Sequence, residues 1–159
     1  MAGSVKLEER KAFTLAYVEH MGDYSGIPFA EYIDRLYSWA KKRNVRPGFH
    51  PMGIFLDAPG SRPPGKHRSE VGISIAEKVR ASSGIKVRNV PAMKVAAISH
   101  KGPAEEYSAT YAKLGDWIVA HGYEWAGPCI EVYSKRPETV DGKGITYAKV
   151  MAPVKKRRH

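Results

Sequence analysis

Cysteine is almost absent from this sequence, which has one, Cys129, among its 159 residues. A single cysteine cannot form an internal disulfide, and it excludes a zinc site built from several thiolates. A lone thiol is typical of proteins in a reducing compartment. We therefore expect the protein to act in the cytoplasm.

Long apolar runs are also missing. No stretch approaches the roughly 18 apolar residues that a membrane-spanning helix needs. Residues 1–10 carry charges where a signal peptide would have its apolar segment. The sequence predicts no membrane partner, and we interpret residues 1–10 as a short polar lead-in.

Several familiar motifs are absent as well. We find no helix-turn-helix, zinc knuckle or RNP motif, no Ser/His/Asp arrangement and no phosphate-binding glycine loop. His20 and His100 lack partner ligands at zinc spacing, so we expect no metal and no cofactor. Both histidines stand at the end of an expected strand, two residues before a glycine, which favours a capping or hydrogen-bonding role.

The charge is strongly of one sign, at +10, with basic clusters at 41–43, 62–68 and 155–158. Such a balance can indicate a nucleic acid or another acidic partner. Without a matching motif, the simpler interpretation is solubility, together with a disordered tail over 155–159. A gyrase- or nucleic-acid-directed role is the weaker alternative.

What the sequence does contain is typical of one globular domain, with 43 % hydrophobic and 10 % aromatic residues. Alternating and helical spacings predict one helix and three strands in each half of the chain. The first half has strands over 11–20, 51–56 and 69–79 and a helix over 28–44. The second half has strands over 93–100, 129–134 and 145–154 and a helix over 103–121. Loops are expected over 57–68, 123–128 and 135–144.

The two halves also share residues at a fixed offset. His20 and Gly22 match His100 and Gly102 at an offset of 80, and Leu36 and Trp39 match Leu114 and Trp117 at 78. This self-similarity predicts two β-α-β-β repeats, about 11–80 and 87–154, within a single domain spanning 1–159. The predicted fold class is α+β, in which a pseudo-two-fold relates the repeats, and a curved antiparallel sheet carries two long helices.

One strand holds the most informative residue. In the segment 129–134, Cys129, Glu131 and Tyr133 share one face, while Ile130 and Val132 point to the other and suit a core. A carboxylate buried without a partner is costly, so a buried Glu131 would mark a site. The alternative is an ordinary solvated side chain.

The repeat adds an asymmetry at this position. Glu131 matches Gly53 in the first half, although a residue needed for packing should recur in both copies. The difference suggests that Glu131 serves something other than the fold. Gly53 would leave room for the body of a ligand.

The order of several short segments resembles the GyrI-like small-molecule-binding domain, a family that includes gyrase-inhibitor proteins and the effector-binding domains of multidrug-sensing transcription activators. These segments are Val90-Pro91-Ala92, Ser99-His100-Lys101-Gly102-Pro103, Gly122-Tyr123, Ala126-Gly127-Pro128, Glu131-Val132-Tyr133 and Ala152-Pro153-Val154. The resemblance covers roughly residues 11–154. It implies a ligand cleft between the repeats, with a glutamate at its base that maps onto Glu131.

The resemblance implies two functions. In drug-sensing members the glutamate faces aromatic, often cationic, ligands, which predicts a stand-alone protein that captures such compounds. Some stand-alone members hydrolyse cyclopropane-bearing cytotoxic compounds, which predicts a hydrolase with Glu131 as general acid or base. This chain departs from its relatives at Met151, where many of them have an aromatic residue.

The candidate site residues follow from these two interpretations. Glu131 and Tyr111 are the candidate catalytic residues. The candidate ligand contacts are Glu131, Tyr133, Tyr147, Tyr17, Trp39, Trp117, Gly53 and Met151. Cys129 is a poor nucleophile, because the neighbouring carboxylate disfavours its thiolate. The expected partner is a hydrophobic or aromatic small molecule, and the expected state is a monomer or weak dimer.

Overall fold

The structure is a computed structural model that describes residues 3–57 and 61–158. The chain divides into two compact units. The inserted unit comprises Lys11–Ala92, and the terminal unit combines Met1–Arg10 with Met93–His159. Each unit has an antiparallel sheet and one long helix, so the predicted α+β class is confirmed.

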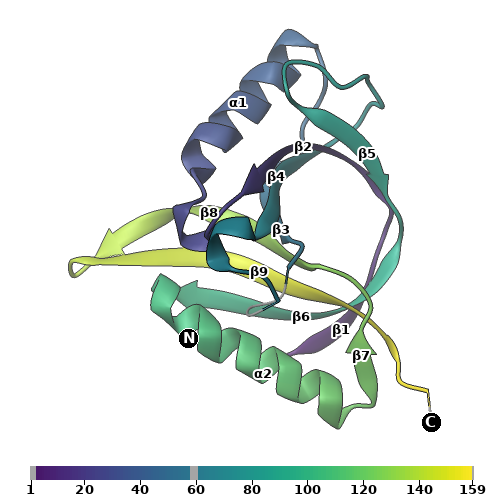
Figure 1. The fold of residues 1–159 in the computed structure, drawn as a ribbon, viewed down its shortest axis with the longest axis vertical. Helices are drawn as coiled ribbons and strands as arrows, with labels where there is room; N and C mark the ends of the chain where they lie inside the picture. Colours follow the sequence, from purple (N-terminus) through teal and green to yellow (C-terminus); the bar gives the residue numbers. More distant parts are fainter. Residues whose placement is uncertain (1–2, 58–60, 159) are drawn as a thin grey trace. The chain divides into compact units, whose positions relative to one another are not determined.

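The described residues of the inserted unit form four strands. They are β2 (Phe13–Met21), β3 (Met52–Phe55), β4 (Arg68–Ile75) and β5 (Lys86–Val90), which pair antiparallel in the order β3-β4-β2-β5. Helix α1 (Phe29–Lys42) lies beside this sheet, and single 3₁₀ turns occur at η1 (Tyr24–Gly26) and η2 (Pro64–Lys66) (Figure 1). Leu36, Trp39 and Ala40 of α1 are buried against Val71 and Ile73 of β4.

In the terminal unit, residues 3–10 and 93–158 form five strands. They are β1 (Lys6–Arg10), β6 (Met93–Gly102), β7 (Tyr123–Trp125), β8 (Cys129–Val140) and β9 (Lys143–Lys156). Four pair antiparallel in the order β1-β6-β9-β8, and β7 pairs with the far end of β9. Helix α2 (Tyr107–Ala120), preceded by the 3₁₀ turn η3 (Ala104–Glu106), crosses one face of this sheet (Figure 1). Leu114 and Ile118 of α2 pack on Ala96, Val150 and Ala152.

Both units contain the order strand, helix, strand, strand, as β2-α1-β3-β4 and as β6-α2-β8-β9, but β5 follows this order in the inserted unit, and β1 and β7 are added to it in the terminal unit. His20 at the end of β2 hydrogen-bonds through Nδ1 to the Tyr32 hydroxyl of α1, at 2.9 Å. His100 near the end of β6 hydrogen-bonds in the same way to Thr110 Oγ1 of α2, at 2.6 Å. Each histidine therefore ties a strand end to the helix that follows it, which confirms the expected hydrogen-bonding role.

Three predictions for segments of the terminal unit were wrong. Residues 6–10 are not a lead-in, because β1 pairs with β6 along its whole length. Residues 123–125 form β7 rather than a loop, and β9 continues through Lys156, where a disordered tail was expected. The tail is held further by the Arg157 N–H, which donates to the Gly122 carbonyl at 2.9 Å. His159 lies outside the described residues.

The loops were also predicted too long. Strand β8 continues to Val140 through two register shifts, so residues 135–140 are strand and not loop. Only Asp141 and Gly142 turn the hairpin, with φ of 51° and 77°, and Asp-Gly tolerates these left-handed angles well. The loop 57–68 contains η2 and is closed by the Asp57–Arg68 ion pair at 2.8 Å, while residues 58–60 lie outside the described residues. No helix in the described ranges is long and apolar enough to span a membrane.

Gly72 of β4 gives a direct test of how tightly the inserted unit is packed. A Cβ added there would lie 2.6 Å from Leu15 Cδ1 and 2.9 Å from the Ala16 carbonyl oxygen. We expect Gly72→Ala to lower the free energy of unfolding by about 1–3 kcal/mol, measured by urea denaturation. Gly115→Ala is the control, because its Cβ would meet open space on α2 and should raise stability by up to about 1 kcal/mol. Equal effects of the two changes would contradict the packing described here.

Candidate functional site

Glu131 lies on β8 in the terminal unit, and its side chain is directed toward α2. Its neighbours on the same face of β8, Cys129 and Tyr133, belong to the apolar layer that α2 covers. In the pairing of β8 with β9, Glu131 is opposite Val150, which belongs to the same layer. The side chain of Glu131 is 7 % exposed, so it is buried and the solvated alternative is wrong.

Two phenols hold the buried carboxylate. The Tyr111 hydroxyl of α2 donates a short hydrogen bond to Glu131 Oε2, and the Tyr133 hydroxyl donates to Oε1 at 3.0 Å. Behind Tyr111, the Cys129 thiol donates to the Tyr111 oxygen at 3.2 Å. We call Glu131, Tyr111, Tyr133 and Cys129 the carboxylate cluster. Helix α2 contributes one member and strand β8 the other three.

Burial controls the protonation of this cluster. It raises the pKa of Glu131, and the hydrogen bonds from Tyr111 and Tyr133 offset only part of that rise. No lysine, arginine or histidine in the described part of the chain forms an ion pair with this carboxylate. A carboxyl group in this setting takes up a proton closer to neutral pH than a solvated one, which suits acid–base chemistry.

The other members of the cluster remain protonated. Burial, together with the charge of Glu131, raises the pKa of Tyr111 and that of Tyr133 well above the usual value. Burial raises the pKa of Cys129 to about 12, which confirms that its thiol is a poor nucleophile. At neutral pH these three groups therefore act as hydrogen-bond donors.

Tyr107 extends the aromatic lining along α2, and the sequence did not single it out as a site residue. Its ring stacks on His100, with centroids 4.0 Å apart, and lies 6.4 Å from the ring of Tyr111. Burial raises its pKa to about 12. The signal in the sequence was the spacing of Tyr107 and Tyr111, four residues apart on one helical face.

Three other predicted ligand contacts lie in the terminal unit but not in the carboxylate cluster. Tyr147 and Met151 of β9 alternate with Ala148 and Val150 and so point away from α2. Tyr147 donates to Glu138 Oε2 at 2.8 Å, and Met151 Sδ accepts from Arg10 Nη1 at 3.7 Å. Trp117 of α2 stacks on His121 at 4.1 Å and on Tyr123 at 6.0 Å.

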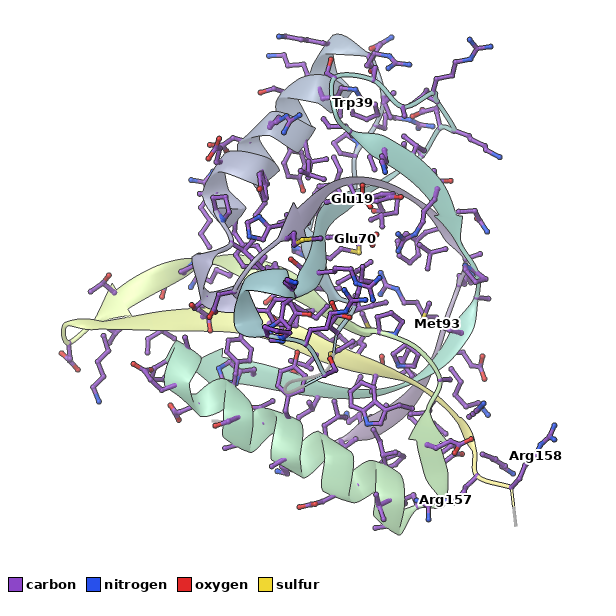
Figure 2. All side chains as sticks on the ribbon, viewed as in Figure 1. Glu19, Trp39, Glu70, Met93, Arg157 and Arg158 are labelled. Atoms are coloured by element: carbon purple, nitrogen blue, oxygen red, sulfur yellow. The ribbon has the colours of Figure 1, made fainter. Side chains whose placement is uncertain are left out.

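The last three predicted contacts, Trp39, Tyr17 and Gly53, belong to the inserted unit. Trp39 of α1 is buried (Figure 2), and its indole N–H donates to Ser82 Oγ at 2.9 Å. Tyr17 of β2 lies beneath the Arg88 guanidinium, 4.7 Å from the ring centroid. Gly53 is buried on β3 opposite Val71. A ligand role for Tyr17, Trp39 and Gly53 stays a prediction.

The sequence analysis missed a second buried carboxylate, Glu70 of β4, which is 4 % exposed (Figure 2). Its Oε2 accepts from Arg88 Nη1 at 2.5 Å. Glu70 therefore already has a cation inside the protein, whereas Glu131 has only neutral donors. Among residues 3–57 and 61–158, no group of three or more His, Cys, Asp or Glu side chains is placed to hold a metal ion.

Comparison with known proteins agrees with this architecture. The model of one family, described as "GyrI-like small molecule binding domain", matches residues 4–155. No curated protein sequence matches the chain significantly. The C-terminal domain of EcmrR superimposes with a TM-score of 0.79 at 16 % identity, covering 96 % of this chain and 98 % of that domain. The chain spans only 57 % of EcmrR as seen in its complex with DNA.

Two further solved structures have the same fold. SAV2435 bound to tetraphenylphosphonium has a TM-score of 0.60 at 13 % identity, covering 96 % of this chain and 94 % of that one. A hydrolase from Listeria innocua has a TM-score of 0.69 at 13 % identity, covering 96 % and 92 %. At these identities the likeness concerns the fold alone.

The burial of Glu131 makes the stability of the protein depend on pH. Its pKa is raised in the folded state, so its protonated form favours folding below the unfolded pKa near 4.5, and this contribution is lost as pH rises through the folded pKa. Each unit of difference between the two pKa values corresponds to about 1.4 kcal/mol. We expect the stability of the wild type relative to Glu131→Gln to fall as pH is raised from acid to neutral, measured by urea denaturation. A wild type that gains stability relative to the variant over that range would show that the carboxylate is stabilised in its charged form.

Proposed function

Because the chain belongs to the family of GyrI-like small-molecule-binding domains, we propose that it captures hydrophobic aromatic compounds, cationic ones in particular, with Glu131 as the polar group that fixes them. The observation that carries this proposal is a buried carboxylate whose partners are all neutral. Ligand sites of this kind are largely apolar and aromatic, with few polar groups that set orientation.

A cationic ligand would supply what the carboxylate cluster lacks. Burying a carboxylate without a counter-charge is costly. A bound cation would supply that counter-charge and would stabilise the ionised carboxylate. The aromatic rings of Tyr111, Tyr133 and Tyr107 could add cation–π attraction of about 0.5–2 kcal/mol. Among the structural neighbours, the tetraphenylphosphonium held by SAV2435 is an aromatic cation. It supports the proposal by showing that this fold accommodates such a ligand.

Capture of a cation would be coupled to proton release. Because the pKa of Glu131 is raised, the free protein keeps this carboxyl group protonated to a higher pH than it would a solvated glutamate. A cation binds the ionised form, so its affinity should rise with pH until that form predominates. The hydroxyl groups of Tyr111 and Tyr133 would stabilise the ionised form during binding.

The other predicted contacts complete the proposal. We propose ligand contacts, each within its own unit, at Tyr147, Met151 and Trp117 of the terminal unit and at Tyr17, Trp39 and Gly53 of the inserted unit. The lone buried thiol is consistent with a reducing cytoplasm as the place of action.

A specific observation favours a second candidate function, a hydrolase for cyclopropane-bearing compounds. Glu131 combines a raised pKa with a direct hydrogen bond to Tyr111, the pairing that acid–base catalysis needs. In this mechanism Glu131 takes a proton from water, and the water oxygen attacks a cyclopropane carbon. The ring C–C bond breaks, and its electron pair passes to a conjugated oxygen that accepts a hydrogen bond from Tyr111. Glu131 then returns its proton to the resulting enolate, so the product has gained one water and the carboxylate is regenerated. A structural neighbour described as a hydrolase supports considering this reaction.

Binding of tetraphenylphosphonium tests the capture proposal. We expect isothermal titration calorimetry to show that Glu131→Gln weakens binding of this cation by about tenfold or more, because a charged interaction is lost. Binding of neutral triphenylphosphine oxide should change little. The matched control is Glu124→Gln on β7, a half-buried glutamate that pairs with Lys155. Wild-type affinity for the cation should rise from pH 5 to pH 8. Cation binding that is insensitive both to pH and to Glu131→Gln would refute this proposal.

Turnover tests the hydrolase candidate. The wild type is incubated with a cyclopropane-bearing genotoxin, and a product heavier by one water is followed by mass spectrometry. We expect Glu131→Gln to slow any such reaction by about 100-fold or more, because the group that moves the proton is gone. Glu124→Gln again serves as the control. Binding without product would leave capture as the function, and turnover that survives Glu131→Gln would remove Glu131 from the mechanism.

A further inference from the structure

Basic side chains gather at the C-terminal end of α1 in the inserted unit. The segments 35–50 and 78–88 contain no aspartate or glutamate. Six of their exposed cations form what we call the basic patch: Lys41, Lys42, Arg43, Arg46, Lys78 and Arg80. Figure 2 shows nitrogen-tipped side chains around this end of α1, near the labelled Trp39.

Hydrogen bonds join these two segments. Arg43 Nη1 donates to the Arg80 carbonyl at 3.2 Å and to Ser82 Oγ at 2.6 Å. Two residues before the second segment, the Ala76 N–H also donates to the Arg46 carbonyl at 2.9 Å. The cations of both segments are therefore held on one surface of one unit.

Structural needs do not account for this concentration of charge. The dipole of α1 favours Lys41 and Lys42 at its C-terminus, but Lys78 and Arg80 come from another segment. The nearest acidic residue in sequence, Glu77, already pairs with Arg46 at 2.9 Å. Most of the positive charge is left unbalanced by the protein, and a surface of this kind is complementary to a polyanion.

An exposed aromatic residue and a cavity adjoin the patch. Phe49 is 96 % exposed, and it follows Arg46 by only three residues. Arg46, Pro47 and Gly48 line an open cavity of about 540 Å³ together with Phe13 and Ser74, among others. A side chain at Gly48 would obstruct it, because an added Cβ would lie 2.2 Å from Ser74 Oγ. A volume of several hundred Å³ suits a ligand the size of a nucleotide.

We propose that this surface binds single-stranded nucleic acid. The phosphates lie along the basic patch, and the unpaired bases stack on Phe49 and enter the neighbouring cavity. A duplex would keep its bases stacked inside and leave Phe49 without a partner. A lipid surface would use the charges but not the cavity. This binding is separate from the carboxylate cluster, which lies in the other unit.

The experiment is fluorescence anisotropy with a labelled oligothymidylate of about 12 nucleotides, titrated with the full chain at several salt concentrations. The patch variant combines Lys41→Gln, Lys42→Gln and Arg80→Gln. The control variant removes the same three charges from exposed positions of the terminal unit, through Lys113→Gln, Arg136→Gln and Lys143→Gln. A second variant, Phe49→Ala, removes the exposed ring and should leave the fold intact.

We expect the patch variant to weaken binding by about tenfold or more at about 0.1 M salt, and to reduce the slope of log affinity against log salt by about 2. The control variant should bind nearly as the wild type does. Phe49→Ala should weaken binding by about fivefold to 100-fold, the range of one lost base stack.

Three outcomes would overturn the proposal. One is equal loss of affinity in the patch and control variants, which would show attraction by net charge alone. Another is a duplex of the same length that binds as tightly as the single strand. The third is binding to vesicles of anionic phospholipid, with no binding of the oligonucleotide at about 0.1 M salt.

Discussion

The candidate site depends on one interaction, the pair of phenol hydrogen bonds that holds the buried Glu131 carboxylate. One phenol, Tyr133, comes from the same strand, but the other, Tyr111, comes from α2 and must be set at the right height above β8. The packing of Leu114 and Ile118 on the sheet fixes that height. An apolar contact one turn away thus determines how far the carboxylate can be stabilised when it ionises, and with it the chemistry open to the site.

Glu70 and Glu131 are two of the three buried carboxylates in the described residues, and comparing them shows what is distinctive about Glu131. Glu70 and Arg88 form an ion pair within the inserted unit, so the charge of Glu70 is compensated by the protein itself. Glu131 is equally buried but has only hydroxyl donors, and its charge is left for a ligand or a proton to compensate. Burial alone would not distinguish Glu70 from Glu131 as candidate site residues. Their partners separate a carboxylate with a structural role from one suited to binding or proton transfer.

The sequence predicted both helices and six of the strands, because their apolar residues recur at clear helical or alternating spacings. It also predicted that Cys129, Glu131 and Tyr133 share a face, since strand alternation leaves little freedom. It did not predict β1, β5 and β7, which are short, polar strands defined by their pairing partners. It read 135–140 as a loop because proline and polar residues there mask a strand with two register shifts. The partners of Glu131 depend on how α2 lies over β8, which local patterns do not specify.

The connections between the two units have a consequence for how the chain assembles. Arg10, the last residue of β1, is the direct pairing partner of Met93, the first residue of β6. The chain therefore passes from the terminal unit into the inserted unit, and back again, at the same residue pair of the β1–β6 pairing. While residues 11–92 are unfolded, they form a long loop that this ladder must close against its entropy. Once they fold, that entropy has already been lost. The pairing of β1 with β6 should therefore be easier once the inserted unit has folded, although β1 belongs to the terminal unit.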